Sequence, residues 1–409
     1  MFAIPMSSPD LTTVEIEAVN QVLRTPYLSL GPRIAEFEHR FAAYVGARHA
    51  VGVSSGTAGL HLSIIAAGVK EGDMVVTTPF SFIASANCIL YERGIPVFVD
   101  VDPATGNIDP VLVARAVEAL TDDRRPETKN RWLPPIFRYL QRASLVGRLK
   151  AILPVHAFGQ PADMDLILDV ARRHKLKVIE DACEAIGAEY KDRKIGTLGD
   201  AAVFAFYPNK QMTTGEGGMI ITNRRNWADL FGSLRNQGRD VVDAWLDHTR
   251  LGYNYRLNEL SAALGAVQLE RIEHLLARRA QVAEWYNERL ANVESIQRPS
   301  IAPTTSRMSW FVYVVRIRPP ANRDEVMHRL SEAGIPSRPY FLPIHLQPFY
   351  RQKFGYRRGD FPVAEYLGDV SLALPFSSLM TEDQVDWVCT TLKKIPDHCH
   401  LSSLALMTA

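Results

Sequence analysis

The sequence predicts an α/β protein in which a mostly parallel sheet lies between helices, followed by a smaller α+β domain. The chain has 409 residues, which is too long for one ordinary hydrophobic core, and 47% of them are hydrophobic, enough to bury two. Short apolar runs alternate with stretches of helical periodicity through the first two thirds of the chain. Such alternation is typical of a parallel sheet covered by helices on both faces.

Two amphipathic helices are predicted before the first strand. Apolar residues recur at helical spacing in residues 12–24 and again in residues 34–45. The strands of the sheet are then predicted from short apolar runs, most of them separated by helical stretches such as residues 164–174. These runs are residues 50–53, 75–78, 96–100, 151–155, 177–181, 201–205 and 218–222.

The C-terminal part of the chain has a different pattern. A long helical stretch leads away from the sheet, and beyond it one alternating run predicts an antiparallel strand and two periodic runs predict helices. We place the domain boundary in the long helix, which gives a large domain over residues 1–270 and a small domain over residues 271–409. The four segments are residues 258–290, 310–316, 324–333 and 381–393.

Composition excludes several classes of partner. The chain has 46 basic and 45 acidic side chains, a net charge of +1, so no global field recruits nucleic acid or an anionic membrane. The start of the chain lacks the pattern of a secretory signal, and no run approaches the length of a membrane-spanning helix. We expect a soluble, cytoplasmic protein.

The cysteines predict no disulfide and no metal site. Cys88, Cys183, Cys389 and Cys399 show no paired spacing, so reduced thiols are the simplest interpretation. The Asp-His-Cys-His run at residues 397–400 has no second cluster of ligands and lies in a tail. We therefore expect no metal.

A phosphate-binding turn is predicted where the first strand leads into a helix. Ser54, Ser55, Gly56 and Thr57 occupy this junction. Glycine and hydroxyl residues at a helix start present free backbone N–H groups and the positive end of the helix dipole to an anion. The same residues also cap helices that bind nothing, and that alternative stays open on this stretch alone.

Lys210 is the candidate Schiff-base lysine. It is the only basic residue between Phe204 and Gly218, and it follows an apolar run that breaks at Tyr207 and Pro208. A lysine that attacks carbonyls needs an apolar or cationic surrounding, which nearby aromatic residues could supply. The alternative is a loop lysine in water.

Asp181 and Phe82 complete the candidate site. Asp181 closes an apolar strand, and a buried carboxylate is costly unless it meets a cation such as a protonated pyridine nitrogen. For each residue taken singly, the favoured interpretation is a helix cap for Asp181 and a core residue for Phe82. In chain order with Gly56, Thr57 and Lys210, they make a coherent site for a phosphorylated pyridine aldehyde.

These stretches resemble the sugar-nucleotide aminotransferases of the DegT/DnrJ/StrS type, which belong to the fold-type-I pyridoxal-phosphate (PLP) enzymes. The resemblance covers most of residues 4–290 and continues more weakly to about residue 390. The matching stretches are residues 54–57, 81–82, 96–103, 154–163, 180–181, 206–210, 215–218 and 251–259.

The resemblance implies a role for each site residue. Lys210 would form the Schiff base with PLP and move the proton, and Asp181 would contact the pyridinium nitrogen. Phe82 would stack on the ring, and Glu184 would lie near its phenolic edge. The phosphate would be held by Gly56 and Thr57, with Asn254 from the other subunit of a homodimer that shares its active sites.

One position departs from the family. Its members often have serine five residues before the lysine, in contact with the phosphate, and here that residue is Ala205. Other stretches are most similar to perosamine synthases, which aminate C4 of a nucleotide-bound keto-6-deoxy sugar. That similarity implies substrate contacts by Arg338, Tyr340 and His345.

The implied reaction moves an amino group from an amino acid, expected to be L-glutamate, to a nucleotide-linked keto sugar. Two alternatives stay open. One is a PLP-dependent sugar dehydratase, whose lysine position holds histidine, so that Lys210 counts against it. The other is a regulator or scaffold that keeps the PLP fold without turnover.

Residues 122–150 form an insertion relative to the family. They contain eight basic and three acidic residues, a local charge of +5. Leu133, Ile136, Phe137 and Leu140 have helical spacing after Pro134, so we expect an amphipathic helix. Its apolar stripe either packs on the large domain or docks, together with its arginines, on a pathway protein or an anionic membrane.

Overall fold

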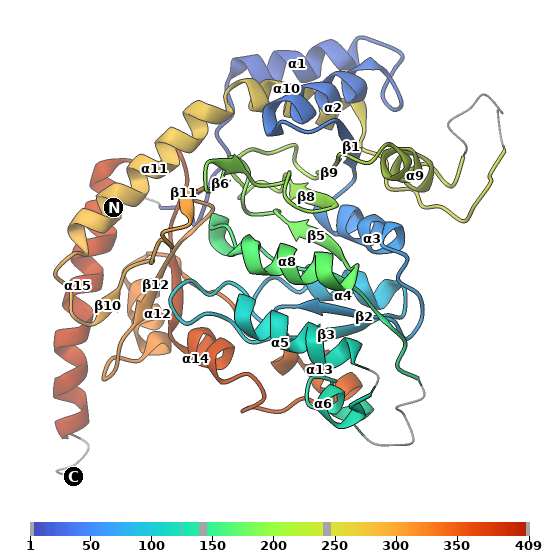
Figure 1. The fold of residues 1–409 in the computed structure, drawn as a ribbon. Helices are drawn as coiled ribbons and strands as arrows, with labels where there is room; N and C mark the ends of the chain where they lie inside the picture. The colour runs from blue at the N-terminus through green and yellow to red at the C-terminus, as the bar shows by residue number, and fades with distance from the viewer. Residues whose placement is uncertain (1–3, 123, 139–144, 240–246, 406–409) are drawn as a thin grey trace.

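A seven-stranded sheet forms the centre of the computed structural model, which describes residues 4–122, 124–138, 145–239 and 247–405, with only the backbone described at residues 126 and 396–405 (Figure 1). The strand order is β1-β9-β8-β5-β4-β2-β3. Strand β9 is antiparallel to both of its neighbours and the other pairs are parallel, so the prediction of a mostly parallel sheet is confirmed. The strands are β1 (His49–Val53), β2 (Met74–Thr77), β3 (Ile95–Phe98), β4 (Leu149–Leu153), β5 (Lys177–Asp181), β8 (Ala201–Ala205) and β9 (Gly218–Thr222).

Three loops meet at one edge of this sheet. Because β1 and β8 are each antiparallel to β9, they run in the same direction, and β5 runs parallel to β8. The carboxyl ends of β1, β5 and β8 therefore lie at the same edge, where ligands bind in open α/β sheets. Ser55, Asp181 and Lys210 follow these three ends.

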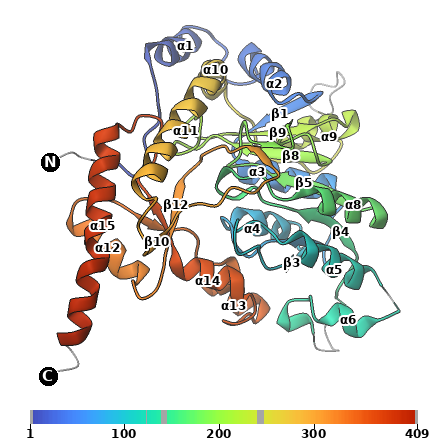
Figure 2. The same ribbon diagram turned by 60° about the vertical axis from the view of Figure 1, so that its left-hand side comes forward.

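Helices cover both faces of the sheet, as Figures 1 and 2 show. One face packs on α3 (Gly56–Ala66), α4 (Ala84–Tyr91) and α9 (Arg225–Arg235). Helix α3 is central and buries Leu60, Leu62 and Ile64, which explains why its sequence is apolar nearly all round. The other face packs on α2 (Pro32–Val45), α5 (Pro110–Thr121), α8 (Met164–His174) and α10 (Glu259–Glu270), and α1 (Thr13–Leu23) lies on α10.

A second hydrophobic core lies around a four-stranded antiparallel sheet of order β10-β12-β14-β13. Helix α11 (Ile272–Arg289) leads into it from α10, and Figure 2 shows α12 and α15 on the side away from the large sheet. Ile4 also packs in this core, so the first described residues lie with the C-terminal part of the chain. The elements are β10 (Ile296–Gln297), β12 (Tyr313–Ile317), β13 (Arg338–Pro339), β14 (Ser371–Leu374), α12 (Arg323–Glu332), α13 (Pro348–Phe354), α14 (Pro362–Val370) and α15 (Glu382–Ala405).

Three short strands join the two cores. They form a sheet of order β11-β6-β7, in which β11 (Thr305–Arg307) pairs with β6 (Glu189–Tyr190), and β6 pairs with β7 (Arg193–Lys194). Two short 3-10 helices, η2 (Ala157–Gly159) and η3 (Ile344–Leu346), lie in loops. No helix among the described residues is long and apolar enough to cross a membrane.

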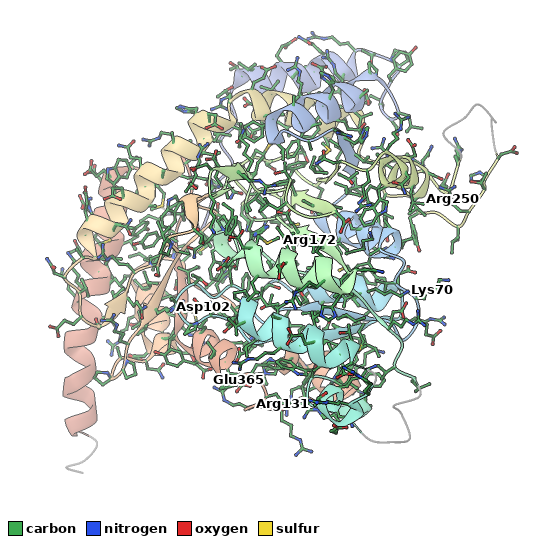
Figure 3. The ribbon with its side chains drawn as sticks, viewed as in Figure 1. Lys70, Asp102, Arg131, Arg172, Arg250 and Glu365 are labelled. Carbon is green, nitrogen blue, oxygen red and sulfur yellow. The ribbon has the colours of Figure 1, made fainter. Side chains whose placement is uncertain are left out.

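The predicted amphipathic helix of the insertion is wrong over its described part. That part contains α6 (Pro126–Asn130) and a single 3-10 turn, η1 (Pro135–Phe137). Pro134 has ψ 143°, an extended conformation that interrupts any helix. Leu140 and Arg142 lie outside the described residues. Arg131, which is labelled in Figure 3, is the residue directly after α6.

Three residues of the predicted apolar stripe pack on other parts of the protein. Leu133 is 2% exposed and belongs to the core under the large sheet. Ile136 and Phe137 pack on α13, with the Phe137 and Phe354 ring centres 6.3 Å apart. The described part of the insertion thus supports the alternative in which the stripe packs on the protein itself, and docking on a membrane or a pathway protein stays a prediction.

Candidate active site

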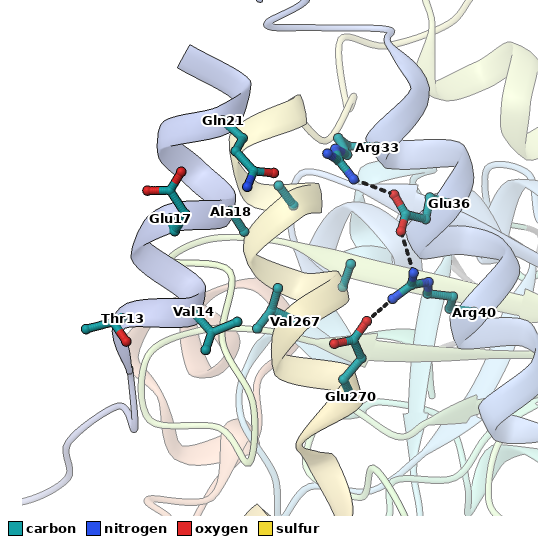
Figure 4. A pocket seen from close by; sticks show the side chains of 12 residues that line it. Thr13, Val14, Glu17, Ala18, Gln21, Arg33, Glu36, Arg40, Val267 and Glu270 are labelled. Atoms are coloured by element: carbon teal, nitrogen blue, oxygen red, sulfur yellow. Dashed lines mark hydrogen bonds and ion pairs between the residues drawn. The ribbon is translucent and has the colours of Figure 1, made fainter. Parts of the chain in front are cut away.

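A cavity of about 390 Å³ lies at the carboxyl edge of the large sheet. Most of the predicted site residues line it: Gly56, Thr57, Phe82, Asp181, Glu184, Lys210 and Tyr340. A second hollow, of about 570 Å³, lies between α1, α2 and α10 and is lined by the ion-paired residues Glu36, Arg40 and Glu270 (Figure 4). It contains none of the predicted site residues.

Lys210 reaches into the cavity from the loop after β8. The strand ends at Ala205, before Tyr207 and Pro208, and the Lys210 side chain is only 13% exposed. Its Nζ lies 3.5 Å from Oε1 of Glu184 and 3.8 Å from the centre of the Phe311 ring. The amine is thus held between a carboxylate and an aromatic face, a partly desolvated setting that suits a reactive lysine.

Asp181 is a buried carboxylate, 5% exposed, at the end of β5. Its Oδ2 accepts a hydrogen bond from Ser85 Oγ at 2.7 Å, and its Oδ1 accepts one from the Cys183 amide at 3.2 Å. No lysine, arginine or histidine forms an ion pair with it within the described part of the chain. A buried acid of this kind suits a cationic ligand atom, such as a protonated ring nitrogen.

Glu184 shares the floor of the cavity with Lys210. Its Oε2 accepts a hydrogen bond from the Phe158 amide at 2.9 Å. Burial raises the pKa of Glu184 above its ordinary value, while the Lys210 charge works in the opposite direction. Burial, and next the charge of Glu184, raise the pKa of Tyr340 to about 12, so this phenol is a hydrogen-bond donor at neutral pH.

The N-terminus of α3 forms a tight cradle on the same cavity. Ser55 caps the helix by accepting a hydrogen bond from the Ala58 amide at 3.1 Å. A Cβ added at Gly56 would lie 2.8 Å from the Ala205 Cβ and 2.8 Å from the Cys183 Sγ, so the backbone approaches these residues as only glycine allows. The first amides of the helix can therefore face an anion in the cavity.

Phe82 is a large aromatic residue that is 62% exposed, although it lines the cavity. Core phenylalanines are buried, so an exposed ring at a cavity wall is better placed to cover a flat ligand. The ring face, the uncompensated acid, the helix N-terminus and the amine together fit PLP. The PLP ring matches the Phe82 face, and its pyridine nitrogen matches the Asp181 carboxylate. Its phosphate matches the N-terminus of α3, and its aldehyde matches the Lys210 amine.

Three predicted residues lie outside the cavity lining. His345 is fully buried, its Nε2 donates to Glu365 Oε1 at 2.9 Å, and its ring packs on Phe361, so it supports the core rather than a substrate. Arg338 is exposed on β13, and its Nη1 donates a hydrogen bond to the Ser337 carbonyl at 2.9 Å. Asn254 is exposed between two tyrosines and does not reach the cavity of its own chain.

Sequence reasoning missed Ser85, Phe311, Gln211 and Arg279. Ser85 lies on α4 and binds Asp181, although 96 positions separate them. Phe311 comes from the segment before β12, the Gln211 side chain donates to the Glu184 carbonyl, and Arg279 donates to the Lys210 carbonyl. Of these four residues, only Gln211 could have been found from the sequence, because it is next to Lys210. The other three contacts arise from the tertiary fold.

Comparisons with known proteins agree with this geometry. The pattern of the DegT/DnrJ/EryC1/StrS aminotransferase family matches residues 9–393. The chain is 39% identical to a GDP-perosamine synthase of Caulobacter vibrioides, over 96% of this chain and 98% of that protein. It is 36% identical to the spore coat polysaccharide biosynthesis protein SpsC of Bacillus subtilis, over 96% of this chain and 97% of SpsC.

A solved structure matches over nearly the whole fold. The structure of S. venezuelae DesV in complex with a ketimine intermediate has a TM-score of 0.83 and 30% identity to this chain, and it covers 96% of this chain and 98% of DesV.

Proposed function

The chain belongs to the DegT/DnrJ/EryC1/StrS aminotransferase family, and from that premise we propose that it uses PLP to move an amino group from L-glutamate to C4 of a nucleotide-linked keto-6-deoxy sugar. The observation that carries this proposal is the meeting of Lys210, Asp181, Phe82 and the α3 N-terminus around one cavity. Such a reaction serves the synthesis of amino sugars for surface glycans.

PLP, when bound, supplies an electron-accepting ring next to the carbon that gains or loses a proton. Asp181 would keep the ring nitrogen protonated, because its buried carboxylate forms no ion pair with another residue in the described part of the chain. Gly56 and Thr57 would hold the phosphate, and Phe82 would cover the ring. These residues bind and orient; they exchange no proton with the substrate.

Lys210 carries the proton. Its amine is the only one in the cavity lining, and the Glu184 carboxylate 3.5 Å away balances its positive charge. In the first half-reaction its Nζ would take the proton from the α-carbon of the donor amino acid as general base and give it to the cofactor carbon as general acid, and in the second half-reaction it would move a proton in the reverse sense, from the cofactor carbon to the sugar carbon. The 13% exposure of its side chain limits water around the amine.

The sugar substrate is proposed from the relatives. The GDP-perosamine synthase and the spore coat protein both match over nearly the whole chain. Tyr340 is the predicted substrate residue that lines the cavity, and it donates a hydrogen bond at neutral pH. The remaining volume beside Phe82 and Tyr340 is where a polar sugar ring can reach Lys210.

The test is a two-step assay of purified protein with bound PLP. L-Glutamate alone should shift the absorbance near about 420 nm and release 2-oxoglutarate. Nucleotide-linked 4-keto- and 3-keto-6-deoxy sugars with GDP, UDP or dTDP are then added, and products are identified by mass. We expect amination of a 4-keto sugar in the wild type and none in Lys210→Ala.

Each other outcome excludes a specific part of the proposal. Amination of a 3-keto sugar alone would contradict the C4 position. Loss of a sugar hydroxyl without amine transfer would indicate the dehydratase. An unchanged spectrum with every amino donor tried, in protein that holds PLP, would support a regulator or scaffold.

A further inference from the structure

Arg279 is a buried cation whose partners are backbone carbonyls. It lies on α11, is 2% exposed, and forms no ion pair with a carboxylate among the residues that the structure describes. Burial lowers its pKa to about 10, so it stays charged at neutral pH. Burying a charge without a counter-ion is costly, and such a cation needs several strong hydrogen bonds.

Those hydrogen bonds go to two segments that meet at the cavity. Arg279 Nη2 donates to the Lys210 carbonyl at 2.8 Å and to the Asn209 carbonyl at 3.3 Å. Arg279 Nη1 donates to the Phe311 carbonyl at 3.0 Å and to the Trp310 carbonyl at 3.4 Å. One planar guanidinium therefore ties the lysine loop to the segment that leads into β12.

The side chain of Gln211 makes a parallel connection on the other side of Lys210. Its Nε2 donates to the Glu184 carbonyl at 2.6 Å and to Ser309 Oγ at 2.8 Å. The backbone on both sides of the lysine is thus bound to residues 309–311. Because the Phe311 ring lies 3.8 Å from Lys210 Nζ, the distance between the two segments determines where the amine lies.

We propose that Arg279 is a positioning residue for Lys210, holding the lysine loop against residues 309–311 so that the amine faces Glu184 and Phe311. The assignment rests on the proposed function, in which Lys210 is the residue that moves the proton. Arg279 touches neither substrate nor cofactor. It acts through the backbone of its neighbours, and α11 connects it to both cores.

The experiment compares Arg279→Gln and Arg279→Lys with wild type. The glutamine cannot span four carbonyls, so we expect kcat to fall by about a hundredfold, the loss that a shift of the order of 1 Å can cause, with a small change in KM. The lysine variant keeps the charge with three donors on one atom, and should recover part of kcat.

A readout without PLP separates positioning from catalysis. In the apoprotein, hydrogen exchange followed by mass spectrometry should be faster in Arg279→Gln for peptides covering residues 207–213 and 308–313, and close to wild type in Arg279→Lys. In the PLP-bound protein, borohydride should label Lys210 more slowly in Arg279→Gln. Arg278→Gln, which removes the neighbouring arginine, should change none of these.

A second variant on the same helix serves as the control for a loss of stability. Tyr286 is fully buried on α11, and its hydroxyl donates to the Pro375 carbonyl at 2.8 Å in the second core. Tyr286→Phe should lower the melting temperature and leave kcat and the exchange of residues 207–213 unchanged. If Arg279→Gln behaves like Tyr286→Phe in all readouts, Arg279 is only structural and the proposal is overturned. If borohydride labels another lysine in the wild type, the proposed function fails instead.

Discussion

Ala205 is the residue at which this site departs most clearly from the family pattern. It ends β8, lines the cavity and faces Gly56, where an added Cβ would come within 2.8 Å of its own Cβ. The contact explains why the cradle tolerates only small side chains at both positions. It also places residue 205 where a hydroxyl could reach the phosphate.

Ala205→Ser should therefore slow the loss of PLP on dialysis. A hydroxyl bonded to a charged phosphate contributes about 1 to 3 kcal/mol. Ala205→Cys is the matched control, because a thiol has similar size but is a weak donor. The measurement is the residual absorbance of bound PLP against dialysis time. Equal loss from all three proteins would mean that other groups already saturate the phosphate.

The residues that could be predicted from the sequence share one property. Asp181 ends an apolar strand, and Gly56 and Lys210 come within five residues of the end of one, so their place at the sheet edge follows from chain order alone. Arg279 and Phe311 could not be predicted in the same way. An arginine on an amphipathic helix is usually solvated, and only the packing of α11 on two segments buries this one.

At the scale of elements, α1 is fixed to α10 through Glu15. The Glu15 side chain is 1% exposed and accepts hydrogen bonds from Thr12, Gln268 and Arg271. Burial alone would raise its pKa, but these hydrogen bonds outweigh burial and lower the pKa from 4.5 to about 2. The charged form is therefore favoured by folding.

The lowered pKa predicts a specific acid sensitivity. A depressed carboxylate contributes stability above its unfolded pKa, and the contribution is lost as the pH falls from about 4.5 towards about 2. The difference in free energy of unfolding between wild type and Glu15→Gln should shrink by about 3 kcal/mol over that range. Urea unfolding at several pH values measures it.

The control for this prediction lies one half-turn away on the same helix. Glu17 is half exposed and pairs only with Arg24, itself largely exposed. The free energy of unfolding of Glu17→Gln should differ from that of the wild type by a nearly constant amount over the same pH range. A constant difference for Glu15→Gln as well would contradict the role given to its hydrogen bonds.

Elements with strong periodicity were predictable, and those that depend on packing were not. The helix predicted over residues 164–174 has the bounds of α8, and the strand predicted at residues 177–181 has those of β5. The helix predicted in the insertion was wrong for two reasons. Leu133, Ile136 and Phe137 have helical spacing but pack against two different surfaces, and Pro134, between Leu133 and Ile136, is extended.

At the scale of the whole molecule, the position of Asn254 favours a site completed by a second chain. Tyr253 and Tyr255 stack on each other with ring centres 5.0 Å apart and pack around His61, while Asn254 between them is exposed. The Tyr255 carbonyl accepts from the Ser54 amide at 2.8 Å, which fixes this loop beside the cradle. We propose that Asn254 reaches the phosphate site of a partner.

Subunit mixing tests this arrangement. Lys210→Ala and Asn254→Ala homodimers should each be inactive or nearly so. A mixed dimer has one site that lacks both groups and one that is intact, so mixing should restore activity up to about a quarter of the wild type for random exchange. Exchange is followed by mass with one tagged chain. Complete exchange without rescue would mean that each site is built within one chain.

The central claim is that amino transfer in this protein passes through Lys210, and chemical trapping tests it most directly. PLP-bound wild type is reduced with borohydride, digested and mapped by mass, and the Lys210→Ala variant is treated in parallel. The account predicts that the phosphopyridoxyl mass lies on the peptide that contains Lys210, that glutamate added before reduction removes it, and that the variant carries no such label. A label on any other lysine of the wild type would contradict the account.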